Sequence, residues 1–135
     1  MADDSLLRFH NPPTLPVSVG YSQVAEARGG RTIYVAGQVP LDTAGRLVGP
    51  GDPQAQARQV FANVAAALAA AGATFRDVVK LTIFVVDIGS LPAIRAARNE
   101  HVDTARPPAS SIVEVRRLFR DDVLLEVEAI AVVAA

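Results

Sequence analysis

The chain has 135 residues, a formal net charge of −1 at neutral pH, and a composition that is 50% hydrophobic and 20% charged. This length suits one domain spanning residues 1–135, and the near-neutral charge gives no general attraction to nucleic acid or to an anionic membrane. The lack of cysteine excludes disulfides and thiolate chemistry, and the two histidines, His10 and His101, lie in no metal-ligand spacing.

Nothing in the sequence indicates export or membrane insertion. Residues 1–5 are acidic and lack the basic region of a secretory signal. No apolar run reaches the ~18 residues that a membrane helix needs. We therefore expect a soluble cytoplasmic protein, and its high apolar content for so small a domain hints at a buried contact between subunits.

The first part of the chain is expected to form a loop followed by a hairpin. Prolines at positions 12, 13 and 16 disfavour regular structure in residues 1–20. Alternating residues predict strands at 22–27 and 32–38, and Gly29-Gly30 between them predicts a tight β-hairpin turn. A turn-rich surface loop then covers residues 42–51.

The clearest helix begins at Asp52-Pro53 and ends at Gly72. Aspartate caps free backbone amides, and proline is tolerated in the first turn of a helix. Apolar residues recur at helical spacing and predict one buried stripe, made of Ala57, Val60, Phe61, Val64, Leu68 and Ala71.

The second half of the chain alternates strands with a helix. Residues 78–86 form a strand that is apolar at nearly every position, which predicts that both its faces are covered. A helix capped by Ser90 follows from Leu91 to about Val102, then a strand at 111–115, a charged turn at 116–122 and a strand at 123–133. This order predicts an α+β fold with both helices on one face of a mixed sheet, so another copy of the chain is expected to bury the other face.

The last predicted strand places two carboxylates on one face. Side chains alternate along a strand, so Glu126 and Glu128 lie together, opposite an apolar face. A buried carboxylate without a partner is costly. Two interpretations stay open: the glutamates form ion pairs at a sheet edge, or one of them faces a ligand pocket.

Familiar catalytic motifs are absent from the sequence. It contains no Walker loop, no Gly-x-Gly-x-x-Gly after a strand and no His-Glu-x-x-His. Arg116, Arg117 and Arg120 cluster in one turn, which is more typical of a solvated tip than of a nucleic-acid surface. The remaining chemistry is a carboxylate acting on water in a cleft between subunits.

Several blocks of the sequence resemble the RidA family, also called the YjgF or L-PSP endoribonuclease-like family. The resemblance runs from about residue 11 to residue 133. Its most specific parts are Ala-Gly-Gln-Val-Pro at 36–40 and Glu-Val-Glu-Ala-Ile-Ala at 126–131, supported by residues 20–23 and 77–85.

This resemblance implies a chorismate-mutase-like fold and a homotrimer, whose sheets form a central β-barrel with a small-molecule cleft at each subunit interface. It also implies hydrolysis of reactive enamines or imines to keto acids and ammonia, without a cofactor or a metal. The implied water-positioning residue is Glu126, and Tyr21 and Gly37 belong to the implied cleft. Ser110 stands where the family has a carboxylate-binding arginine, and Arg95 stands in place of a cleft asparagine.

The loss of that arginine bears on the ligand. A guanidinium makes a two-pronged contact with a carboxylate that serine cannot reproduce, and losing about 1.5–3 kcal/mol lowers affinity about ten- to a hundredfold. Arg95 is the stronger candidate to restore the charge and Arg106 the weaker one; if neither enters the cleft, a neutral or differently charged ligand is expected.

The leading hypothesis is a hydrolase of enamines or imines, the alternative is a metabolite-binding trimer without turnover, and an endoribonuclease is least supported.

Overall fold

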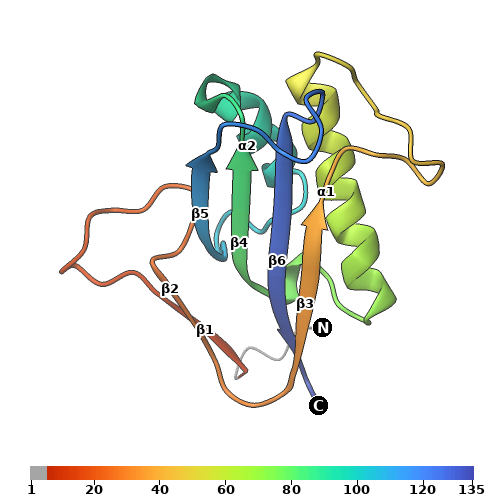
Figure 1. Ribbon diagram of the computed structural model, residues 1–135. Helices are drawn as coiled ribbons and strands as arrows, with labels where there is room; N and C mark the ends of the chain where they lie inside the picture. The colour runs from red at the N-terminus through yellow and green to blue at the C-terminus, as the bar shows by residue number, and fades with distance from the viewer. Residues whose placement is uncertain (1–5) are drawn as a thin grey trace.

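The computed structural model describes residues 6–135 and contains a four-stranded mixed sheet with two α-helices behind one of its faces (Figure 1). The sheet has the order β3-β6-β4-β5, and its strands are β3 (Arg31–Gln38), β6 (Leu125–Val133), β4 (Val78–Val85) and β5 (Ala109–Glu114). The helices are α1 (Pro53–Ala70) and α2 (Leu91–Asn99), with short 3-10 turns η1 (Phe75–Asp77) and η2 (Ile88–Ser90). The predicted α+β fold is confirmed.

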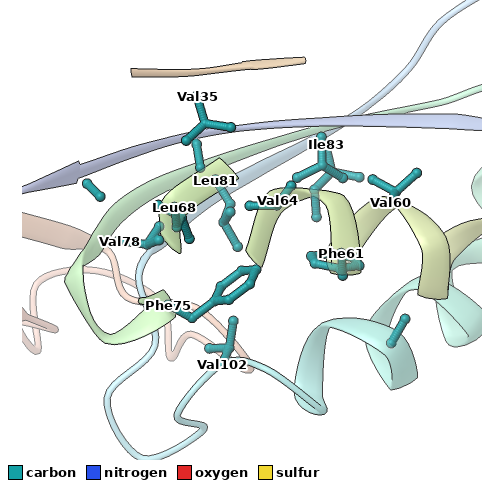
Figure 2. Close-up of a cluster of buried hydrophobic side chains, with 14 of the residues drawn as sticks. Val35, Val60, Phe61, Val64, Leu68, Phe75, Val78, Leu81, Ile83 and Val102 are labelled. Atoms are coloured by element: carbon teal, nitrogen blue, oxygen red, sulfur yellow. The ribbon is translucent and has the colours of Figure 1, made fainter. Parts of the chain in front are cut away.

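Helix α1 begins as the sequence predicts. The Asp52 carboxylate accepts hydrogen bonds from the backbone N–H groups of Gln54 and Ala55, both at 3.1 Å. The predicted stripe is buried except for Ala71, which is half-buried just past the end of the helix. Figure 2 shows this stripe packed against the sheet and against residues from η1 and the segment after α2.

Strand β6 lies in the middle of the sheet and has the two-faced character that was predicted. It pairs antiparallel with both β3 and β4. The residues facing the helices are all buried, namely Leu125, Val127, Ala129, Ala131 and Val133. Glu126 and Glu128 lie on the opposite face, in register with Phe84 and Thr82 of β4.

The beginning of the chain differs from the prediction in two ways. Part of the predicted loop is a strand, β1 (Leu7–His10), which pairs antiparallel with β2 (Val24–Ala27) in a separate two-stranded sheet. The predicted hairpin is wrong, because β3 pairs with β6 and not with β2. Gly29 and Gly30 have φ values of +74° and +81°, and this conformation turns the chain from the small sheet into the large one.

The face of the sheet away from the helices is mixed in character. The strand predicted to be apolar on both faces buries Leu81 and Ile83 against the helices, whereas Lys80 and Thr82 are half-buried on the other side. Beside them Tyr34 is 77% exposed. Burial of this face by another copy of the chain stays a prediction.

Neither α1 nor α2 has the length and apolar character needed to cross a membrane, and no other helix in residues 6–135 does.

Gln56 is a buried polar residue that holds two loops onto α1. Its side-chain amide donates to the carbonyls of Gly49 and Asp122, at 3.0 and 3.1 Å, and its Oε1 accepts from the N–H of Leu124 at 2.9 Å. The chain therefore enters β6 at a position fixed by α1. Sequence patterning missed this residue because a single glutamine beside an apolar stripe reads as a surface residue.

We predict that Gln56→Ala lowers the free energy of unfolding by about 2–4 kcal/mol, since it leaves the Leu124 amide unpaired and opens a void. Gln54→Ala, on the exposed side of the same helix turn, is the matched control and should change it by less than about 0.5 kcal/mol. Urea unfolding at equal protein concentration measures both; equal effects would contradict the assigned role.

Candidate functional site

A cavity of about 310 Å³ lies between α2, β5 and the segment before β2. Its polar lining consists of Tyr21, Arg95, Arg98 and Ser110. Its apolar lining consists of Val19, Ile88, Leu91 and Ile112. The structure therefore brings together three of the predicted ligand-binding residues, Tyr21, Arg95 and Ser110, and adds Arg98.

Tyr21 is positioned by its buried neighbour Ser22. The Ser22 N–H donates to the carbonyl of Pro108 at 3.0 Å, and its hydroxyl donates to the carbonyl of Pro107 at 2.6 Å. Ser22 also forms a parallel bridge with Ala109 at the start of β5. These bonds fasten the segment that carries Tyr21 beside Ser110.

Ser110 faces the helix side of the sheet. It lies in register with Leu81, which is fully buried beneath the helices. The Ser110 hydroxyl oxygen is buried, and within residues 6–135 it has no hydrogen-bond partner. An unsatisfied buried hydroxyl costs free energy, so this atom calls for an explanation.

Arg98 is the residue that sequence reasoning missed. It is only 5% exposed, and its Nε donates to Asn99 Oδ1 at 3.1 Å. Burial, and after it the positive charge of Arg95, lower the pKa of the Arg98 guanidinium. A signal was available: Arg98 lies four residues after the inward-facing Ile94, so it falls within the apolar stripe of α2.

Arg106, the weaker substitute considered for the missing arginine, lies elsewhere. Its guanidinium donates to the carbonyl of Leu7 at 3.0 Å and stacks over the ring of Phe9, 4.7 Å from its centre. It thus secures β1 to the loop before β5 and does not line the cavity.

Glu126 and Gly37 form a second group, on the face of the sheet away from the helices. A bulge between Val35 and Gln38 interrupts the pairing of β3 with β6 at this point. It brings Gly37 so close to Glu126 that a Cβ on Gly37 would overlap the carboxylate. Bulges commonly redirect a side chain beside a functional site.

The ion-pair interpretation of the two glutamates is not supported. Within residues 6–135, neither Glu126 nor Glu128 forms a hydrogen bond or ion pair through its side chain. Lys80, the nearest cation along the register, donates instead to the Ser111 hydroxyl at 2.9 Å. Glu126 is half-buried and Glu128 is exposed, so Glu126 is the glutamate with the more enclosed surroundings.

The arginine turn is largely neutralised by its own acidic residues. Arg117 pairs with Asp121 at 2.7 Å, and Arg120 makes a two-pronged contact with Asp122 at 2.7 and 3.0 Å. This pairing favours the predicted solvated tip over a nucleic-acid surface.

The histidines occupy separate sites. His10 contacts Glu26 at 2.8 Å, and this hydrogen bond, followed by that from Arg28, lowers the pKa of Glu26. His101 packs against the ring of Phe75 with 5.1 Å between ring centres. In the part of the chain that the structure describes, no three or more His, Cys, Asp or Glu residues gather where they could hold a metal ion.

Comparisons with known proteins agree with this architecture. The profile of the family described as Endoribonuclease L-PSP matches residues 13–133. A RutC family protein from Synechocystis is 40% identical over 87% of this chain and 89% of its own length. The 2-iminobutanoate/2-iminopropanoate deaminase of Escherichia coli is 43% identical over 76% of this chain and 80% of its own length.

A solved structure from Yersinia pestis also matches nearly the whole chain. It is described as a protein of unknown function of the conserved Rid family, YyfB. It superposes with a TM-score of 0.88 at 40% identity, covering 95% of this chain and 99% of the other.

Two glycines test how rigidly the Arg98 guanidinium is held. Gly20 (φ +81°) lies where a Cβ would come 2.5 Å from Arg98 Nη2, whereas Gly45 (φ +77°) has open space around it. We predict that Gly45→Ala and Gly20→Ala each cost about 1 kcal/mol of unfolding free energy from backbone strain, because a Cβ at position 20 meets only the flexible end of the Arg98 side chain, which can move aside.

Denaturant unfolding of both variants measures these costs, which should agree within about 0.5 kcal/mol. A cost of Gly20→Ala that exceeds that of Gly45→Ala by more than about 1 kcal/mol would show instead that the Arg98 guanidinium is held rigidly against this segment.

Proposed function

The chain belongs to the Endoribonuclease L-PSP family, also known as the RidA or YjgF family, and on that premise we propose that it hydrolyses a small reactive imine or enamine. The observation that carries this proposal is the half-buried Glu126 carboxylate, which has no ion-pair partner within residues 6–135 and lies directly against Gly37. Such a carboxylate is available to accept a proton from water. The imine deaminase activity named for the Escherichia coli relative supports this class of reaction.

The site is completed between copies of the chain in a homotrimer. Ser110 faces the helix side of the sheet with Leu81, whereas Glu126 faces the opposite side with Phe84. One copy therefore cannot present both residues to the same small molecule, but two neighbouring copies can. An exposed apolar side chain lies in each region. Val19, 81% exposed, lines the cavity, and Tyr34, 77% exposed, lies beside Glu128 on the face that carries Glu126. Both suit burial against a neighbour.

The reaction requires only water and proton transfers. Glu126 removes a proton from water while the oxygen attacks the carbon of the protonated imine, which gives a tetrahedral aminoalcohol. Glu126 then returns this proton to the nitrogen, and ammonia leaves while the carbon–oxygen double bond forms. Glu126 accepts the hydroxyl proton in this step and passes it to the released ammonia. The protonated imine and one water thus become a carbonyl compound and ammonium, and the sequence of steps balances without an oxidant or a cofactor.

A second function has a specific observation in its favour. Ser110 stands where the family carries an arginine, so this chain lacks that contact to a substrate carboxylate. The protein would then bind a metabolite in the same cleft without turning it over. Ligand-induced thermal stabilisation combined with hydrolysis at the buffer rate would establish this alternative.

We predict that Glu126→Gln lowers the rate of imine hydrolysis at least about a hundredfold, because the amide cannot accept the proton. Glu128→Gln is the matched control, since it removes the same charge from the same face two residues away and should change the rate by less than about threefold. The assay measures keto acid and ammonia released from imines generated by an amino-acid oxidase. If both variants keep the wild-type rate, Glu126 is not the base.

A further inference from the structure

Arg98 carries a buried positive charge that the protein itself does not neutralise. It is 5% exposed, and within residues 6–135 no carboxylate forms an ion pair with it. Its guanidinium donates a hydrogen bond to Asn99 through Nε. A guanidinium buried in this way is costly for folding unless something else offsets the cost.

A second arginine faces the same cavity. Arg95 lies one helical turn before Arg98 and lines the cavity beside it. Residues at this spacing have Cβ atoms about 5–6 Å apart. Arg95 is exposed, so one positive charge lies at the mouth of the cavity and the other lies deep within it.

Nothing acidic lines the cavity to balance these charges. The remaining polar lining groups are the phenol of Tyr21 and the hydroxyl of Ser110, whose oxygen has no partner in the described chain. The cavity therefore combines two cations, an unsatisfied hydroxyl and a volume of about 310 Å³ that suits a small molecule. Charges arranged in this way complement two separated negative groups better than one.

We propose that the cavity selects a dicarboxylate, with Arg98 holding one carboxylate at the bottom and Arg95 holding the second at the mouth. This inference deepens the proposed function, on which it rests: the substrate would be the imine or enamine of a small dicarboxylic acid. The separation of the arginines by one helical turn matches carboxylates two or three carbons apart better than a compact phosphate, whose charges sit on one group.

Direct binding tests the selection independently of turnover. Succinate and butanoate have the same number of carbons and differ by one carboxylate, and inorganic phosphate tests the compact dianion. By isothermal titration calorimetry on the intact oligomer we expect succinate to bind at least about tenfold tighter than either of the others. Equal binding of succinate and butanoate would overturn the proposal, as would tighter binding of phosphate or no binding of succinate.

Variants separate a binding role for Arg98 from a structural one. Arg98→Met keeps the length of the side chain and should weaken succinate at least about tenfold, while the melting temperature of the free protein stays the same or rises because a buried charge is removed. Arg95→Met should lower the affinity for succinate to about the affinity for butanoate. Arg58→Met, which removes a charge from the exposed face of α1, should change neither quantity.

The outcomes for the two proposals are distinct. If Arg98→Met lowers the melting temperature and leaves succinate binding intact, Arg98 is structural and the inference fails. If Arg98→Met lowers both, Arg98→Lys decides, because it keeps the charge and should bind succinate more tightly than Arg98→Met; equal affinities would overturn the inference. Selective succinate binding without imine hydrolysis would overturn the proposed function and leave this inference standing. If imines of monocarboxylic acids are hydrolysed as fast as those of dicarboxylic acids, the proposed function stands and this inference is overturned.

Discussion

The alternation of side chains along β6 is the constraint on which the rest of the structure depends. Its inward residues are buried beneath α1, which contacts both β6 and β3. Because the period of a strand is two residues, burying Leu125 and Val127 fixes Glu126 on the opposite face. Hydrophobic burial thus sets the direction of the carboxylate, and a register slip of one residue would place that charge in the core.

The two halves of the candidate site follow from this geometry. The half formed by Glu126 and Gly37 depends on β6 and on the bulge in β3. The other half depends on the attachment of the Tyr21 segment to β5 and on a helix that buries an arginine. Within one chain these halves face opposite sides of the sheet, so the proposed reaction requires an assembly. The cost of burying Arg98 without a carboxylate is most simply understood if the site exists to receive an anion.

Much of this could be predicted from the sequence, because the strongest signals were local. The Asp52 cap, the stripe of α1 and the two faces of β6 each depend on spacing within a single element. The prediction failed where pairing was decided at long range. Gly29-Gly30 is compatible with a hairpin, but β3 gains a better partner in β6, and Leu7–His10 is too short a run to show its pairing with β2.

The sequence also predicted part of the candidate site. Tyr21, Arg95 and Ser110 do share one cavity, whereas Glu126 and Gly37 lie on the other face, and their joint role stays a prediction. Arg98 was missed because a charged residue is normally assigned to solvent. Only the packing of α2 against the Gly20 segment makes its burial evident.

The central claim, that neighbouring chains complete one another's sites, can be tested by subunit complementation. One chain would carry Glu126→Gln and the other Ser110→Phe, which fills the cavity, and each alone should form an inactive oligomer. Mixed oligomers purified through different tags should regain imine hydrolysis, since they contain an interface at which an open cavity meets an intact Glu126. Mixed oligomers as inactive as either parent would contradict the account.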